Sequence, residues 1–274
     1  MLSPFQLTQI QQLQERCEKE EQILLKLNWD LLNTRKKSEK RDFFYEDNGQ
    51  LVGFLGLYSF GSKVEICGMV HPEYRNRGIF STLLKEALAI CDSENISTIL
   101  LNAPAASESA KKFLQNRSFS YRFSEYEMQW EETSLNSTED VVIRKATKED
   151  LPLEIELDVR CFQFSQKDAL EYNERIKKEN TQSFYMIEHA GVTVGKMRLD
   201  YTNEEAWIYG FAILPEYQGK GIGRKALVNM VMAEQEKERP VFLEVEATNK
   251  HALKLYNDCG FKPYSVQDYY ERRR

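Results

Sequence analysis

The chain has 274 residues, of which 42% are hydrophobic and 29% are charged, and its formal net charge is −6. This composition is typical of a soluble globular protein with one large domain or two ordinary ones, and the acidic balance argues against nonspecific nucleic-acid binding. No apolar run is long enough to cross a membrane and the N-terminus lacks a signal-peptide pattern, so we expect no membrane association and a cytoplasmic location.

The cysteines and histidines argue against two kinds of site. The five cysteines are scattered and form no Cys-x-x-Cys pair, which is typical of reduced thiols. The three histidines lie near no cysteine in the sequence and lack the spacing of metal ligands. The sequence therefore predicts no metal site and does not support a cysteine nucleophile.

The first half is expected to begin with an amphipathic helix and to continue into three strands. The strands are expected at residues 42–46, 51–58 and 63–70. Asn48 and Gly49 lie between the first two strands and are typical of a hairpin turn. The helix has an apolar face formed by Phe5, Leu7, Ile10, Leu13 and Cys17.

The second half follows a polar stretch, residues 131–140, which has neither helical nor strand periodicity. A strand is expected at residues 141–145. Thr147, with Asp150 three residues later, is then typical of a helix cap. The later elements are expected to be a helix at 168–179, strands at 183–188 and 192–200 joined at Ala190-Gly191, and a last strand at 241–246.

The most informative segment is residues 213–226, in which a strand end runs through glycines into a helix. Residues 206–213 before it are aromatic and β-branched, as in a buried strand. Residues 218–223 can turn their backbone N–H groups inward, where the glycines leave room for a diphosphate and the helix N-terminus favours its charge. The segment predicts a seat for a phosphate-bearing cofactor.

The same pattern occurs earlier in the chain, at residues 70–84, and aligning the two copies places Arg75 on Gln218. Residues 110–119 fall on residues 252–261 in the same way. Because the order of elements is the same in both halves, the sequence indicates a duplicated domain.

The duplication defines the expected organisation of the chain. We expect one domain at residues 1–130, a linker at 131–140 and a second domain at 141–274. Strand pairs followed by strand–helix–strand units predict an α/β fold with a sheet of mixed direction in each domain.

A dinucleotide site is one alternative for the glycine segment. Gly221-x-Gly223-x-x-Ala226 matches the dinucleotide fingerprint, and Glu244 lies about 20 residues further on, as a ribose-binding acid would. However, residues 215–218 separate the strand from the glycines, and too little chain follows for a dinucleotide-binding sheet. An NAD-dependent oxidoreductase therefore remains an alternative hypothesis, and it requires that the protein bind a nicotinamide cofactor.

The strand end and glycines, read together with the segment 249–261, resemble the GCN5-related N-acetyltransferases. The resemblance covers essentially all of 141–274 and, more weakly, 42–130. It implies two tandem domains of this family, each a mixed, largely antiparallel sheet flanked by helices. It also implies transfer of an acetyl group from acetyl-CoA to a primary amine.

The resemblance implies which residues contact acetyl-CoA. The glycine turn would bind the diphosphate, the strand end before it would pair with the pantetheine amides, and one N–H there would polarise the thioester carbonyl. An asparagine at the next strand-to-helix turn would contact the pantetheine arm or serve as a plain helix N-cap. These residues are Ala212, Ile213, Leu214, Gln218, Gly219, Lys220, Gly221, Ile222, Gly223, Arg224 and Asn249.

Two side chains are the predicted catalytic groups. Tyr256, in the family's C-terminal segment, is the predicted proton donor to the leaving thiolate, the alternative being a ring that only packs in the core. Many relatives carry a glutamate base at the position of Tyr209, which cannot serve near neutral pH without a large pKa shift. Glu244 is the predicted base instead, with Glu246 on the same strand face. One alternative is that Glu244 and Glu246 only face solvent. Another is that the base belongs to the acidic pair at residues 204–205.

The first half lacks these groups at the aligned positions. Leu114 replaces Tyr256, so the sequence predicts a catalytically degenerate, structural N-terminal domain. Ser107 and Asn102 likewise occupy the positions of Asn249 and Glu244, and Phe80 that of Gly223. Arg75, Arg77 and Gly78 still offer donors to a phosphate, so coenzyme A binding in this half is left open.

The leading hypothesis is an N-acetyltransferase, and the alternative is a non-catalytic acetyl-CoA-binding regulatory module. The acceptor is a small-molecule or peptide amine, with polyamine, amino acid, antibiotic and protein N-terminus all left open, as is the oligomeric state. Loops at 161–170 and 262–272 are expected to shape the acceptor pocket, with Phe162, Phe164 and Tyr269 as candidate lining residues or as packing residues.

Overall fold

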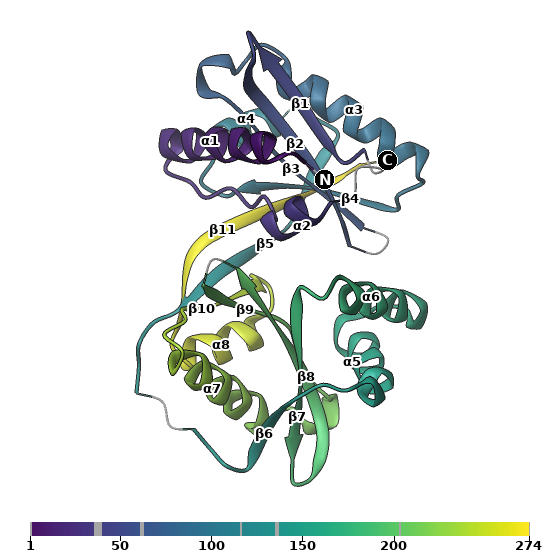
Figure 1. Cartoon of the computed structure of the whole chain (residues 1–274), viewed down its shortest axis with the longest axis vertical. Helices are drawn as coiled ribbons and strands as arrows, with labels where there is room; N and C mark the ends of the chain where they lie inside the picture. The colour runs from purple at the N-terminus through teal and green to yellow at the C-terminus, as the bar shows by residue number, and fades with distance from the viewer. Residues whose placement is uncertain are drawn as a thin grey trace. The chain divides into compact units, whose positions relative to one another are not determined.

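The computed structural model describes residues 2–35, 40–60, 63–115, 117–134, 137–202 and 204–273. Its chain divides into two compact units (Figure 1). Unit 1 consists of Met1–Glu125 together with Ser265–Arg274, and unit 2 consists of Tyr126–Tyr264.

The units differ from the expected division at the end of the chain, because two long strands are divided between them. Strand β5 (Phe119–Trp130) begins in unit 1 and ends in unit 2, whereas β11 (Phe261–Arg272) begins in unit 2 and ends in unit 1. In unit 1, β11 pairs antiparallel with β4 (Thr98–Pro104) from Gln267–Pro104 to Glu271–Leu100. The last ten residues therefore contribute to the first unit.

In unit 1, a sheet in the order β1-β2-β3-β4-β11-β5 separates two layers of helices. Helix α1 packs on one face against β2 and β3, and α3 packs on the other face with its own apolar cluster. The elements not yet given are α1 (Pro4–Glu21), α2 (Trp29–Thr34), β1 (Asp42–Asp47), β2 (Gln50–Phe60), β3 (Lys63–Val70), η1 (Pro72–Tyr74), α3 (Ile79–Ser93) and α4 (Glu108–Leu114).

In unit 2, the sheet order is β5-β10-β9-β8-β7-β6, with α7 and α8 on one face and α5 and α6 on the other (Figure 1). Buried residues of α7 and α8 form the larger core with one face of β8, β9 and β10. The elements are β6 (Val141–Lys145), η2 (Lys148–Asp150), α5 (Leu151–Phe162), α6 (Gln166–Glu179), β7 (Gln182–His189), β8 (Val192–Thr202), β9 (Glu205–Ile213), η3 (Pro215–Tyr217), α7 (Ile222–Gln235), β10 (Val241–Glu246) and α8 (Lys250–Asp258).

Local sequence signals predicted the turns correctly. Asn48 and Gly49 both have positive φ between the paired strands β1 and β2, and Ala190 and Gly191 do the same between β7 and β8. The expected apolar face of α1 was wrong at Phe5, which is 69% exposed. At about 3.6 residues per turn, Phe5 lies on the other side of the helix from the buried Ile10 and Cys17.

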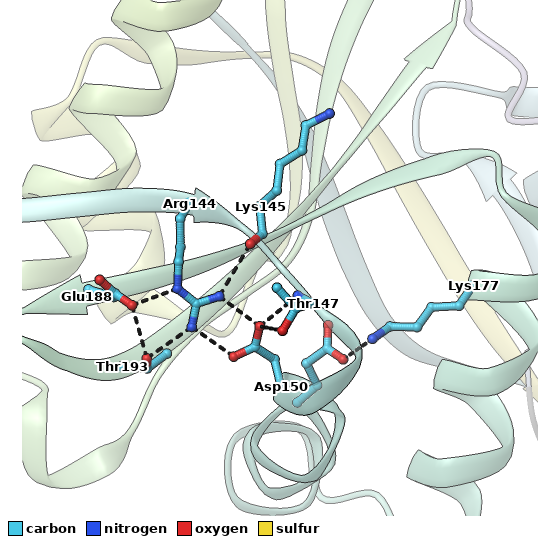
Figure 2. Close-up of polar contacts among 8 residues, drawn as sticks. Arg144, Lys145, Thr147, Asp150, Lys177, Glu188 and Thr193 are labelled. Carbon is cyan, nitrogen blue, oxygen red and sulfur yellow. Dashed lines mark hydrogen bonds and ion pairs between the residues drawn. The ribbon is translucent and has the colours of Figure 1, made fainter.

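The start of α5 is fixed by a polar cluster around Arg144 of β6 (Figure 2). Its guanidinium donates to Asp150 at 2.7 and 2.8 Å and to Glu188 of β7 at 2.6 Å. The carboxylate of Asp150 also accepts from the backbone N–H of Thr147 at 2.7 Å, which completes the predicted capping box. Hydrogen bonding to Arg144 is the main cause that holds the pKa of Asp150 well below its usual range.

No helix within the described parts of the chain is long and apolar enough to cross a membrane. Among the same residues, no group of three or more histidine, cysteine, aspartate or glutamate side chains could hold a metal ion.

Candidate active site

The glycine turn of unit 2 connects β9 to α7 and leaves the start of the helix open. Gly221 is the N-cap of α7, with φ 80° and ψ −4°, and no side chain caps the helix there. Gly219 also has positive φ, and a Cβ atom at either glycine would meet nothing within 4 Å. The first N–H groups of α7 therefore have space in front of them, as the seat of an anionic phosphate requires.

The strands beside this turn separate from one another. Strands β9 and β10 pair in parallel from Val241–Ala206 to Leu243–Ile208, and their pairing goes no further within the described strands. Because β9 continues to Ile213 and β10 continues to Glu246, an opening lies between their carboxyl ends. An extended ligand with amide groups can enter such an opening and bond to the strand backbone.

The backbone at the end of β9 is partly committed to other partners. Leu214 donates its N–H to Val194 O at 2.8 Å and accepts from Tyr217 N at 2.8 Å. The carbonyl of Ile213 accepts from Gln218 Nε2 at 2.8 Å. The Leu214 N–H is thus unavailable to a ligand. Ala212, two residues earlier, faces β8 in the same way, because it is in register with Lys196, so the Ile213 N–H is the remaining candidate.

Asn249 and Tyr256 both belong to the turn and helix of α8. Asn249 is the N-cap, and its side-chain oxygen accepts from Ala252 N at 3.1 Å. Tyr256 is 9% exposed in the core on the α7 face, and its ring lies 6.1 Å from that of Phe261. Burial raises the pKa of Tyr256 to about 12, so the phenol is protonated near neutral pH. Within the described residues, its hydroxyl has no hydrogen-bond partner.

Glu244 projects from the opposite face of the sheet. Its neighbours Leu243 and Val245 are buried in the α7 core, so the half-buried Glu244 side chain points to the α5 face. Trp207 and Phe242 stack on that face with ring centroids 4.9 Å apart. The sheet therefore places the two predicted catalytic side chains on opposite sides of the opening.

The corresponding region of unit 1 has the same backbone with different side chains. Gly78 is the N-cap of α3 with φ 80° and ψ 0°, and the parallel pairing of β3 with β4 ends at Ile66–Leu101. A cavity of about 700 Å³ lies here, and Asn102 and Leu114 are among its lining residues. The Nδ2 atom of Asn102 is buried without a partner in the described part of the chain.

One expected acceptor residue lies elsewhere. Tyr269 belongs to unit 1, where it is 1% exposed and accepts a hydrogen bond from Lys26 Nζ at 2.9 Å. Tyr269 is therefore a packing residue, stacked on Phe123, which was the alternative to lining an acceptor pocket. Phe162 is 41% exposed, and Phe164 packs against Tyr172 at 5.5 Å.

Glu21, which no pattern in the sequence singles out, bonds across the cavity of unit 1. This residue ends α1 and forms an ion pair with Arg75, and its other oxygen accepts from Ser107 Oγ at 2.7 Å. Only an acidic residue at a helix end was visible in the sequence, and no spacing linked it to residues so distant in the chain.

Comparison with known proteins places both halves of this chain in one family. The model of the Acetyltransferase (GNAT) family matches residues 6–119 and again residues 151–261. The chain belongs to this family, and both halves are members of it. The resemblance inferred from the motifs is therefore confirmed.

Curated relatives match shorter stretches. Spermine/spermidine N(1)-acetyltransferase of Bacillus subtilis is 37% identical over 65 residues, which cover 23% of this chain and 43% of the relative. The alanine N-acetyltransferase of ribosomal protein bS18 from Escherichia coli is 36% identical over 69 residues, 24% of this chain and 46% of the relative. The chain thus spans less than half the length of these relatives. A putative bS18-alanine N-acetyltransferase of Bacillus subtilis is 28% identical over 130 residues, 47% of this chain and 85% of the relative.

Solved structures show the same fold over the whole chain. A GCN5-related N-acetyltransferase from Sphaerobacter thermophilus has a TM-score of 0.80 at 16% identity, with 100% of this chain and 95% of that chain covered. A tandem GNAT protein from the clavulanic acid biosynthesis pathway has a TM-score of 0.72 at 15% identity, with 99% and 96% covered. The predicted fold of two tandem family domains with mixed, largely antiparallel sheets is confirmed.

Acetyl-CoA is the acetyl donor of this family, and the residues present in unit 2 fit it. The open glycine turn fits a diphosphate, and the opening between β9 and β10 fits an extended arm that carries amides. The fit rests on backbone geometry that the structure shows directly.

Proposed function

We propose that unit 2 catalyses acetyl transfer from acetyl-CoA to a primary amine and that unit 1 is catalytically degenerate. The observation that carries this proposal is the combination, in unit 2, of an open glycine turn, separated strands and Tyr256. Unit 1 has the first two features, but Leu114 stands where Tyr256 would be. A leucine can neither donate nor accept a proton.

The turn and the two strand ends are the proposed cofactor site. Residues 218–223 and the start of α7 would hold the diphosphate through backbone N–H groups, and the exposed Lys220 and Arg224 add positive charge. The Ile213 N–H would pair with a pantetheine amide or polarise the thioester carbonyl, and Asn249 would offer its side-chain amide. When bound, acetyl-CoA supplies the acetyl group as an activated thioester.

Tyr256 is the proposed acid on the α7 face of the sheet. Its pKa of about 12 keeps the proton on the phenol at neutral pH. Because an alkyl thiol has a pKa of about 8.5, the phenol yields its proton to the leaving sulfur only if another group replaces that proton. The acceptor nitrogen loses two protons when it changes from ammonium to amide, so one of them can replace the phenol proton.

Glu244 is the proposed base on the α5 face, where the second nitrogen proton leaves. An ammonium has no lone pair to attack a carbonyl, so a carboxylate that removes its proton is needed before transfer. The half-buried Glu244 lies on the strand face that also carries Phe242 and Trp207. An acceptor on this face would therefore meet both a negative charge and an aromatic surface.

The relatives support a primary amine as the acceptor without fixing its kind. One relative is named for spermine and spermidine as its acceptors, and the other is named for an alanine of a ribosomal protein. Both acceptors present a primary amine, and this shared group is what we propose for the present chain.

A transfer assay tests the proposal. The release of free thiol from acetyl-CoA is followed with a panel of polyamines, amino acids and peptides, with the wild type and with Tyr256→Phe and Glu244→Gln. We expect turnover with at least one amine and a loss of turnover in both variants, with coenzyme A binding retained. Binding without turnover on any amine would instead support the non-catalytic regulatory module, and no binding would contradict both.

A further inference from the structure

The cavity of unit 1 lies where unit 2 has its proposed cofactor site. The cavity measures about 700 Å³, a volume within the range of small-ligand sites. Its walls are the end of β3 with the following turn on one side and the end of β4 with the start of α4 on the other. Arg75, Gly78, Ser107 and Leu114 line it.

Glu21 connects these two walls. One carboxylate oxygen forms an ion pair with Arg75, which follows β3, and the other accepts from Ser107 Oγ at 2.7 Å, at the start of α4. Arg75 is held in place in turn, since its Nε donates to Val70 O at 3.2 Å. The side chains of Glu21 and Arg75 are only 15% and 23% exposed. A carboxylate from α1 therefore crosses the opening that the separated strands leave.

The Glu21 carboxylate, which bridges Arg75 and Ser107, is held in its charged form. Burial acts to raise the pKa of Glu21, but hydrogen bonds from Ser109 and Ser107 and the charge of Arg75 outweigh it, and the net direction is downward. The carboxylate is thus ionised at neutral pH, and no physiological change of pH releases it.

Unit 2 has no such bridge at the equivalent positions. Gln218, which corresponds to Arg75, bonds to Ile213 O on its own strand. Asn249, which corresponds to Ser107, caps its own helix at Ala252. Among the described residues, neither side chain has a further hydrogen-bond partner, so the two walls of this opening are not linked through them.

We propose that Glu21 excludes the pantetheine arm of coenzyme A from unit 1 and so limits the chain to one cofactor, in unit 2. The inference rests on the proposed function, which assigns the positions of Gln218 and Asn249 to cofactor contacts. A pantetheine arm in unit 1 would have to displace Glu21 and leave the half-buried charge of Arg75 without a partner. The displaced carboxylate would also repel the diphosphate at the nearby turn.

Calorimetric titration of the full-length chain with coenzyme A tests this proposal in a background that silences unit 2. Gly221→Glu places a carboxylate in the turn of unit 2, and we expect this variant to bind no coenzyme A. Adding Glu21→Ser and Arg75→Gln removes both charges together and gives unit 1 the glutamine of unit 2. We expect this triple variant to bind one coenzyme A per chain under conditions in which Gly221→Glu alone binds none.

The matched control is Gly221→Glu with Glu20→Gln, which removes a charge from the exposed neighbour of Glu21. We expect this control to bind no better than Gly221→Glu. A second variant, Gly221→Glu with Glu21→Gln, keeps the size of the side chain and is expected to gain binding as well. Thermal unfolding of each variant checks that unit 1 remains folded.

Two results would overturn the proposal. In one, Gly221→Glu already binds coenzyme A as tightly as the triple variant. In the other, neither Glu21 variant gains binding although both remain folded. The proposed function fails separately, when the wild type binds no coenzyme A.

Discussion

Gly78 in unit 1 and Gly221 in unit 2 have nearly the same backbone conformation, with φ of 80° in both and ψ of 0° and −4°. A Pro-Glu-Tyr turn of 3₁₀ helix precedes each glycine. A cysteine thiol bonds to the carbonyl at the strand end in both units, Cys17 to Val70 and Cys161 to Ile213. The two copies have thus kept the same local hydrogen bonds of the scaffold.

The side chains that could do chemistry differ between the copies. Tyr256 of unit 2 corresponds to Leu114 of unit 1, which is buried in the core of α3. The turn and the separated strands are thus present in a copy that has leucine at the position of Tyr256. This difference teaches that the backbone of the site does not by itself tell which copy is active, and that a few side chains must be tested for it.

The largest expected effect concerns Tyr256. Tyr256→Phe removes the proposed proton donor and keeps the ring, so we expect kcat to fall by roughly 10²-fold or more, with coenzyme A affinity little changed. Tyr121→Phe, at a 58% exposed position of unit 1, is the control and should leave kcat unchanged. A Tyr256→Phe enzyme with wild-type kcat would show that the two copies differ at this position only in packing.

The second prediction concerns Asp150, whose contact with Arg144 fixes the start of α5 in unit 2. Asp150→Ala leaves the guanidinium of Arg144 with one acid partner fewer and removes the helix cap, so we expect a loss of about 2–3 kcal/mol in the free energy of unfolding of unit 2. Urea denaturation measures it. Glu171→Gln, in an exposed ion pair with Lys167 at 3.8 Å, should change stability by less than about 0.5 kcal/mol.

The same contact predicts a pH dependence. Because the folded-state pKa of Asp150 is depressed, its stabilisation is fully present above the pKa of an unfolded aspartate, about 3.9, and is lost as the pH falls further. Urea midpoints measured between pH 7 and pH 3 should therefore decrease more for the wild type than for Asp150→Ala. Parallel curves for the two proteins would contradict this assignment.

The shared turn predicts an equal effect in the two copies. Alanine at Gly78 or at Gly221 must adopt positive φ, at a cost of about 1–2 kcal/mol each. Gly223→Ala is the control, because its φ is not positive and its new Cβ atom would meet neighbours at an ordinary 3.6 Å or more. Destabilisation in one unit only would show that the turns are not equivalent.

A final prediction concerns the alkaline limb of the rate profile. Because burial raises the pKa of Tyr256 to about 12, its proton is retained well above neutral pH. We therefore expect no decrease of kcat from this group below about pH 11 in a pH–rate profile. A decrease centred near pH 9 that Tyr256→Phe abolishes would contradict the raised pKa.

Local signals in the sequence predicted the local structure well. Asn48-Gly49 and Ala190-Gly191 identified their turns, and the strand expected at 63–70 agrees with β3 (Lys63–Val70). These features depend on the preferences of neighbouring residues, which the sequence shows directly. The glycine turn was predictable for the same reason, since positive φ and an uncapped helix start leave a pattern in the sequence.

Contacts between distant residues could not be predicted in this way. Glu21 and Ser107 meet although 86 positions separate them, and Tyr269 belongs to the unit that begins the chain. Such pairings follow from the packing of whole elements rather than from local preference. The faces on which Glu244 and Tyr256 lie also required the structure, because strand alternation alone does not tell which face α7 covers.

The pairing of β11 with β4 has a consequence for the synthesis of this protein. The ribosome releases the residues of β4 long before those of β11, so the first unit to emerge must wait for the last ten residues before its sheet is complete. Loss of residues 265–274 would therefore damage the sheet of unit 1, which is translated first, rather than that of unit 2.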